Sequence, residues 1–204
     1  MWRGFFVHGY AMHKTLYLLT GALLFCVHVN ARGADAEAGK RKAQTCAACH
    51  GPDGNATQPG LPSLAAQPAM HTFLQLVQFR EKRRRDPVMS PFAEKLTDRD
   101  MQDIGAYYAA QKPLPAAFNA DATKAALGRK TLEMHYCGSC HMPNLAGQNH
   151  IPRLAGQNYE YLVKQLRGLK AGTRPDIDGT MASAAQALTE QDIENLAHYL
   201  AGLK

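Results

Sequence analysis

The stretch "TCAACHGPDGN" at residues 45–55 places Cys46, Cys49 and His50 within five positions. Cysteine and histidine bind zinc, cysteines pair in disulfides, and C-x-x-C-H attaches haem covalently. A zinc site wants four ligands, usually from two pairs within one small module, and this stretch supplies one pair and one histidine. A disulfide needs no adjacent histidine. Haem fits, because two thiols at this spacing reach two vinyl groups while the next imidazole turns onto the iron.

A second stretch, "YCGSCHMPNLAGQN" at 136–149, repeats the motif with Cys137, Cys140 and His141, 91 positions after the first. Other segments repeat in the same order: "LPSLAAQ" (61–67) matches "IPRLAGQ" (151–157), and "KLTDRDMQDIGAYYA" (95–109) matches "ALTEQDIENLAHYLA" (187–201). The segment 111–121, with two prolines, is typical of a linker. The chain is therefore expected to contain two tandem domains, 37–115 and 116–204, each with one haem.

Both halves show apolar residues at helical spacing, with Gly/Pro-rich loops between them and no alternating strand pattern. The pattern predicts an all-α fold in which each domain wraps around its haem. Two T-x-x-D signatures, Thr97 with Asp100 and Thr189 with Asp192, mark the start of the last helix in each half. The predicted helices are Ala38–Ala48, Ala69–Arg84, Asp98–Gln111, Ala122–Gly138, Tyr159–Ala171 and Glu190–Leu203.

Residues 1–36 differ from the rest, with Arg3 and Lys14 followed by the apolar run "LYLLTGALLFCVHV". This run is short for a membrane span but suits a secretory signal peptide. We expect cleavage after Ala36; Ala31 is a second small-residue site, and an uncleaved membrane anchor is the alternative. Translation from Met12 would still give a complete signal. Cleavage removes Cys26, so the remaining cysteines all lie in the two motifs.

The second axial ligand of each haem decides its chemistry. Met89 lies 39 residues after His50 and Met181 lies 40 after His141, each in a Pro/Gly loop before the last helix. This equivalence predicts His50 with Met89 and His141 with Met181 as iron ligands, which leaves no open site for substrate and favours electron transfer. Pro62 and Pro152 are either turn residues or carbonyl acceptors for the two imidazoles. The other methionines and histidines considered as ligands are Met70, His71, Met101, Met142, His150 and His198.

The segments "CAACHGPDGN", "LPSLAAQ" and "MSPFAEKLTDRDMQDIGAYYA", with "CGSCH", "IPRLAGQ" and "TMASAAQALTEQDIENLAHYLA", resemble the diheme cytochrome c4 family over about residues 37–204. The resemblance implies a periplasmic electron carrier without enzyme activity, in some members membrane-attached, that serves a terminal oxidase or another respiratory partner. The loop "HMPNLAGQN" after the second motif departs from the more usual "HGPDGN". Two alternatives remain: the cytochrome subunit of a larger dehydrogenase, and a diheme peroxidase-type enzyme, which would need an open axial site.

The chain carries a formal net charge of +6 at pH 7. Its one dense basic run, "REKRRRD" at 80–86, is either a docking patch that steers an acidic redox partner or a solvated helix end whose cations suit the helix dipole. Nucleic acid is an improbable partner for an exported haem protein. The residues of this predicted docking patch are Arg80, Lys82, Arg83, Arg84 and Arg85.

Overall fold

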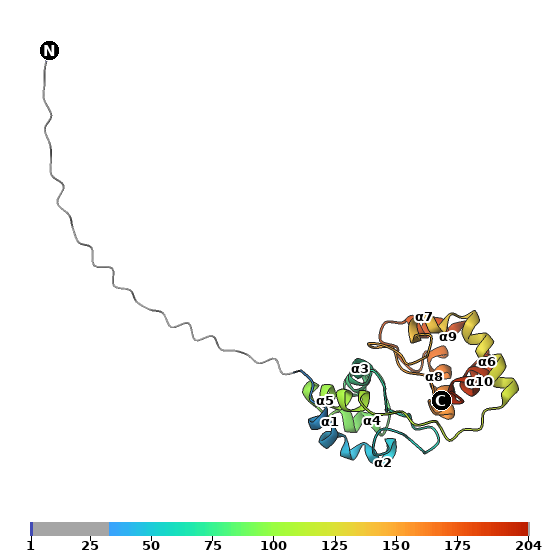
Figure 1. The fold of residues 1–204 in the computed structure, drawn as a ribbon, viewed down its shortest axis with the longest axis horizontal. Helices are drawn as coiled ribbons and strands as arrows, with labels where there is room; N and C mark the ends of the chain where they lie inside the picture. Colours follow the sequence, from blue (N-terminus) through green and yellow to red (C-terminus); the bar gives the residue numbers. More distant parts are fainter. Residues whose placement is uncertain (2–32, 204) are drawn as a thin grey trace. The chain divides into compact units, whose positions relative to one another are not determined.

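The computed structural model describes Met1 and residues 33–203, so nearly all of the predicted signal segment lies outside the described residues. The described part is all-α, and its only β feature is an isolated bridge between Gln148 and Ile151. Figure 1 shows the helices of the two repeats. The first repeat contains α1 Ala36–Lys42, the 3₁₀ turn η1 Ala43–Thr45, α2 Ala47–His50, α3 Ala69–Arg80, α4 Met89–Ala93 and α5 Asp98–Ala109. The second contains α6 Ala122–Met134, α7 Cys137–His141, α8 Tyr159–Lys170, α9 Thr180–Gln186 and α10 Glu190–Ala201.

The six predicted helices are present, but three expectations about their bounds are wrong. The helix expected over Ala38–Ala48 is broken by η1, and the one expected over Ala122–Gly138 ends at Met134 because Tyr136 adopts a left-handed conformation (φ 52°). The helix expected over Ala69–Arg84 ends at Arg80, and residues 81–84 form a turn. The methionine segments, expected as loops, form the short helices α4 and α9. Helices of five and seven residues are too short to show a full apolar period in the sequence.

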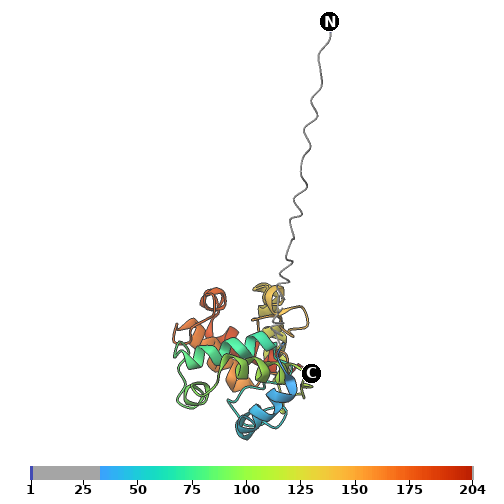
Figure 2. The ribbon, with the colours of Figure 1, turned by 90° about the vertical axis from the view of Figure 1, so that its left-hand side faces the viewer.

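A glycine lets the first and last helices of each repeat approach closely. A Cβ atom on Gly39 of α1 would overlap the backbone carbonyl of Asp103 in α5, and one on Gly128 of α6 would overlap that of Asn195 in α10. The two helix pairs therefore cross with backbone against backbone at equivalent points. In the first repeat α3 also packs against α5 (Figure 2).

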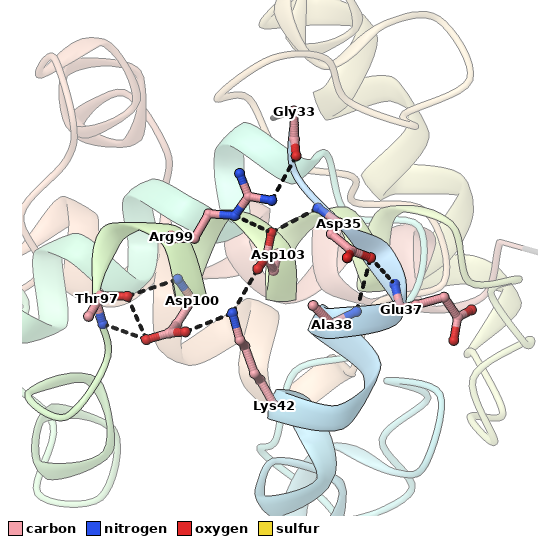
Figure 3. Close-up of polar contacts among 9 residues, drawn as sticks. All are labelled: Gly33, Asp35, Glu37, Ala38, Lys42, Thr97, Arg99, Asp100 and Asp103. Atoms are coloured by element: carbon pink, nitrogen blue, oxygen red, sulfur yellow. Dashed lines mark hydrogen bonds and ion pairs between the residues drawn. The ribbon is translucent and has the colours of Figure 1, made fainter. Parts of the chain in front are cut away.

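Both predicted capping boxes are confirmed. The Thr97 hydroxyl accepts the Asp100 N–H at 3.2 Å, and the Asp100 carboxylate accepts the Thr97 N–H at 2.9 Å (Figure 3). Thr189 and Asp192 form the same pair at the start of α10. Each box satisfies two backbone donors that would otherwise lack partners.

The two repeats differ in the size of their protein cores. The second repeat has a cluster of eleven buried apolar residues drawn from α8, α10 and the loops before each of these two helices. The corresponding cluster of the first repeat has four: Ala43, Ile104, Tyr107 and Tyr108. The first repeat therefore has less buried apolar side chain of its own to stabilise it.

None of the helices among residues 33–203 is long and apolar enough to cross a membrane. The predicted signal peptide or anchor falls almost wholly on residues that the structure does not describe.

Candidate haem-binding sites

Each C-x-x-C-H motif forms a short helical turn, in which the two cysteines stand one turn apart on the same side. Cys49 and Cys140 are exposed, whereas Cys46 and Cys137 are half-buried, and burial raises the pKa of both half-buried thiols. None of these four cysteines forms a disulfide with another described residue. Among the described residues no group of three or more His, Cys, Asp or Glu is placed to hold a metal ion, which argues against a shared zinc site.

The two motif histidines are held in the same way. His50 and His141 are 6% and 7% exposed, and their Nδ1 atoms lie 2.9 Å from the carbonyl oxygens of Pro62 and Pro152. A carbonyl oxygen only accepts, so Nδ1 carries the hydrogen and Nε2 keeps its lone pair. Burial lowers the pKa of both rings, against the opposing effect of the proline carbonyl, and this favours the neutral imidazole. Each ring thus presents Nε2 in the form that binds metals.

The two predicted methionine ligands also occupy equivalent positions. Met89 is the first residue of α4, and its N–H donates to the Asp86 carboxylate at 3.0 Å. Met181 is the second residue of α9, and its N–H donates to the Asp176 carboxylate at 2.5 Å. Both side chains are partly buried, and Met181 packs against the core of its repeat.

Neither aspartate was singled out from the sequence, although each precedes its methionine by a few residues in a Pro-containing segment. Burial raises the pKa of Asp86, but the Met89 and Val88 N–H groups outweigh that and hold it below its usual value. Before each short helix an aspartate side chain accepts backbone N–H groups of the first turn and fixes the position of the methionine backbone.

The other methionines and histidines considered as iron ligands have surroundings unlike those of Met89 and Met181. Met101 is fully buried in α5, Met70 is 51% exposed, and His198 packs against the rings of Phe118 and Tyr159. His71 donates from Nδ1 to the His150 carbonyl at 2.8 Å, across the contact between the repeats. The His150 ring lies 3.6 Å from Asp178. Met142 directly follows His141 in a left-handed conformation.

Two arginines meet at the contact between the repeats. Arg84 donates to Gln75, Tyr161 and Gln165, and Arg174 donates to the same Gln75 oxygen at 3.5 Å. The Arg174 Nε is buried without a hydrogen-bond partner among the described residues. Burial, and after it the charge of Arg84, lowers the pKa of Arg174. A half-buried pair of guanidinium groups with one unused buried donor suits an anionic group, and each haem carries two carboxylates. The cysteines of the two motifs, the two motif histidines and this pair of arginines therefore fit haem c.

The five residues of the predicted docking patch have different surroundings in the structure. Arg84 lies in the contact between the repeats, so its inclusion in an exposed patch was wrong. Arg80 pairs with Asp98 at 2.6 Å and Lys82 with Glu94 at 2.8 Å, which reduces their net charge. Arg83 and Arg85 are exposed and make no ion pair with another described residue. Of the five residues of the predicted patch, Arg83 and Arg85 are therefore the two that are exposed without an ion pair to another described residue.

His71 makes the contact between the repeats sensitive to acid. Burial, with smaller effects from Arg174 and Arg84, lowers the pKa of His71 from 6.5 to about 4. As the pH falls from 6.5 towards 4, His71 binds a proton in the unfolded chain but not in the folded chain. The contribution of His71 to the free energy of unfolding is therefore fully present above pH 6.5 and is lost as the pH falls through this window. We expect His71→Asn to flatten the dependence of urea-unfolding midpoints on pH between 7.5 and 4.5. His135→Asn is the control, and equal pH dependence in all three proteins would contradict the assignment.

Family models match both halves of the chain. The model described as Cytochrome c matches residues 125–204, and the model described as Cytochrome C oxidase, cbb3-type, subunit III matches residues 34–107. Each match covers one C-x-x-C-H motif, one proline carbonyl acceptor and one methionine segment.

Relatives match over nearly the full length. Cytochrome c4 of Pseudomonas aeruginosa is 37% identical over 203 residues, covering 94% of this chain and all of the relative. The crystal structure of reduced recombinant cytochrome c4 from Pseudomonas stutzeri superposes with a TM-score of 0.78 at 33% identity, covering 84% of this chain and all of that one. A protein of Stutzerimonas stutzeri named thiosulfate dehydrogenase electron acceptor is 30% identical over 182 residues, covering 79% of this chain and 80% of the relative.

Proposed function

Because the chain belongs to the cytochrome c4 family of diheme cytochromes, we propose that it carries single electrons between redox proteins of the periplasm through two His/Met-ligated haems. The chain is a c-type electron-transfer cytochrome with two covalently bound haem groups, one in each repeat. We propose in addition the axial ligands of the haem irons, the periplasmic location and the redox partners.

The observation that carries the ligation is the equivalence of the two sites. In each repeat a buried imidazole is hydrogen-bonded to a proline carbonyl, and a partly buried methionine lies in the first turn of a short helix, where the carboxylate of a preceding aspartate accepts its N–H. In this assignment Cys46 and Cys49 bind one haem covalently and Cys137 and Cys140 the other. His50 with Met89, and His141 with Met181, then supply the axial ligands.

The haem iron, when bound, supplies the one-electron redox chemistry. The protein residues supply its ligands and determine its reduction potential. A histidine imidazole and a methionine thioether bound to the iron would leave no position for a substrate and would raise the reduction potential. The Pro62 and Pro152 carbonyls orient the imidazoles and increase their basicity. Arg84 and Arg174 supply positive charge that suits haem carboxylates at the contact between the repeats.

The proposed location and partners follow from the leader and from the relatives. Residues 1–36 have the composition of an export signal, and covalent attachment at C-x-x-C-H is compatible with an exported protein. A terminal oxidase or another respiratory complex is the proposed partner. Arg83 and Arg85 are the cations available to steer an acidic partner, with an on-rate that falls as salt increases.

A second candidate is the electron-accepting subunit of a dehydrogenase. It is favoured by the relative named thiosulfate dehydrogenase electron acceptor, which matches most of both chains. A peroxidase-type role is less well supported, because both repeats offer a second axial ligand at the same position.

The experiment that separates the candidates is stopped-flow electron exchange with the exported holoprotein. A shuttle is expected to reduce a terminal oxidase in many turnovers while remaining separate from its donor on gel filtration. Stable co-purification with a dehydrogenase that reduces it, without transfer to an oxidase, would favour the second candidate. Rapid turnover of peroxide would overturn both.

A further inference from the structure

Two buried glutamines join the repeats in a pseudo-symmetric pair of contacts. Gln157 accepts the Ser63 N–H at 2.8 Å and donates to the Ser63 carbonyl at 2.9 Å. Gln67 accepts the Arg153 N–H at 3.0 Å and donates to the Arg153 carbonyl at 3.0 Å. Both glutamines are 5% exposed and occupy the last position of "LPSLAAQ" and "IPRLAGQ". Each carboxamide thus binds the backbone of the other repeat through both of its polar atoms.

The backbone that each glutamine binds also holds the motif histidine. The Ser63 N–H and the Pro62 carbonyl belong to one peptide group, and that carbonyl accepts from His50 Nδ1 at 2.9 Å. In the other repeat the Arg153 N–H and the Pro152 carbonyl form one peptide group, and that carbonyl accepts from His141 Nδ1 at 2.9 Å. A continuous hydrogen-bonded path therefore runs from each glutamine to the imidazole of the opposite repeat.

We propose that Gln157 tunes the haem of the first repeat through the Pro62–Ser63 peptide, and that Gln67 tunes the haem of the second through the Pro152–Arg153 peptide. This inference rests on the proposed histidine ligation. The glutamines act as positioning residues, since neither contacts the imidazole itself. Their effect crosses from one repeat to the other.

The direction of the effect follows from hydrogen-bond polarisation. A peptide whose N–H donates a hydrogen bond has a more negative carbonyl oxygen, and neighbouring bonds in such a chain strengthen one another. A stronger bond from imidazole Nδ1–H to that oxygen makes the ring a better electron donor to iron, which favours the ferric state. Removing a glutamine carboxamide should therefore raise the reduction potential of the haem in the opposite repeat.

By reciprocity, oxidation of one haem should strengthen the contact that senses it. A ferric iron withdraws electron density from the imidazole, so its Nδ1–H becomes a stronger donor to the proline carbonyl. The same peptide then offers a stronger N–H donor to the glutamine of the other repeat. The contact between the repeats would hence be tighter in the oxidised protein.

The test uses the holoprotein with Gln157→Leu and Gln67→Leu, which remove the carboxamide and keep approximate size. Redox titration followed by NMR of the haem methyl signals assigns a potential to each haem. We expect Gln157→Leu to raise mainly the potential of the haem on Cys46 and Cys49, and Gln67→Leu mainly that on Cys137 and Cys140. In the reduced protein the Nδ1–H resonance of His50 should move upfield in the first variant, and that of His141 in the second.

The matched control is Asn158→Ser, which removes the Asn158 contact with the Gly60 N–H but keeps a helix-capping oxygen and touches neither proline peptide. Its potentials and Nδ1–H resonances should match those of the parent. Equal shifts of both haems in all three variants would mean general loosening and would overturn the proposal. Unchanged resonances and potentials in folded glutamine variants would overturn it as well. A parent protein whose spectrum shows haems without histidine ligands would contradict the proposed function itself. That outcome is distinguishable from failure of the glutamine proposal, because it is seen before any glutamine is replaced.

A separate observation concerns the start of the mature chain. Asp35 caps α1, accepting the N–H groups of Glu37 at 2.9 Å and Ala38 at 3.1 Å. Its own N–H donates at 2.8 Å to the Asp103 carboxylate, which is 2% exposed and also binds Lys42 and Arg99 (Figure 3). Arg99 donates in turn to the Gly33 carbonyl at 2.8 Å. Cleavage after Ala36 would remove this helix cap and one partner of a buried carboxylate.

The geometry points to an exported chain that retains Asp35. Ala31 is the small-residue site that precedes Asp35 in the sequence, so we expect hydrolysis of the Ala31–Arg32 peptide bond in place of the cut after Ala36. Water supplies the hydroxyl of the Ala31 carboxyl group and a proton of the new Arg32 amine. This inference depends on export by a cleaved signal. N-terminal sequencing and intact mass of holoprotein from a bacterial periplasm test it: a first residue at Arg32 is expected, and a chain that begins after Asp35 would overturn it.

Discussion

Replacing Met89 with alanine is expected to lower the reduction potential of the haem in the first repeat while leaving the second haem almost unchanged. Loss of the thioether removes the ligand that favours the ferrous state and opens an axial position. The fall should be on the order of 0.1 V, within the roughly 0.8 V range over which axial ligands set haem potentials. Met181→Ala should do the same to the second haem. Potentiometric titration with absorbance spectra measures both.

Each methionine variant should also convert one haem from low-spin to high-spin or to a weak-ligand state in the oxidised protein, with loss of half of the methionine–iron charge-transfer band. Met70→Ala is the control, because this methionine lies in the first repeat but its side chain is 51% exposed. Spectra of Met89→Ala and Met181→Ala that match the parent would show that neither methionine is a ligand.

Replacing Cys46 and Cys49 with serine is expected to unfold the first repeat and leave one haem per chain. The first repeat has only four residues in its buried apolar cluster, against eleven in the second. A bound haem adds a large apolar surface to that core, so its binding energy contributes directly to folding. The fraction of helix lost, measured by far-ultraviolet circular dichroism, should approach the share contributed by the first repeat.

The matched comparison is Cys137→Ser with Cys140→Ser. The larger core of the second repeat should retain part of its helix without covalent haem, and haem content should again fall to one per chain. A first repeat that keeps its full helix content without haem, or a haem content of two in either variant, would contradict this account.

The fold was largely predictable because its main signals are local and repeated. Helical periodicity, prolines between segments and the T-x-x-D capping pattern occur in both halves, and each half supports the assignment in the other. The short helices α4 and α9 were missed, since an aspartate cap from a preceding turn stabilises them more than any periodic pattern does. The close helix crossings at Gly39 and Gly128 also depend on partners more than 60 residues away.

The candidate site was predictable where residue type alone carries the chemistry. The cysteines and histidines follow from C-x-x-C-H, and the methionines follow from equal spacing in the two halves. The contact between the repeats was not predictable: Gln67 and Gln157 end the repeated segments at 61–67 and 151–157, but nothing in the sequence shows that each side chain is buried against the other repeat. Arg84 was grouped with the exposed basic run for the same reason, although its guanidinium lies against Gln75 and Tyr161. Burial of polar groups depends on how the two repeats meet.

The central claim is that both haems are held between a histidine and a methionine and exchange electrons without binding substrate. A redox titration of the exported holoprotein, followed by absorbance and electron paramagnetic resonance, tests it most directly. The account predicts two one-electron steps, low-spin signals from both ferric haems and a methionine–iron charge-transfer band of twice the intensity of a single site. A high-spin signal from either ferric haem at neutral pH, or a charge-transfer band for only one haem, would contradict it.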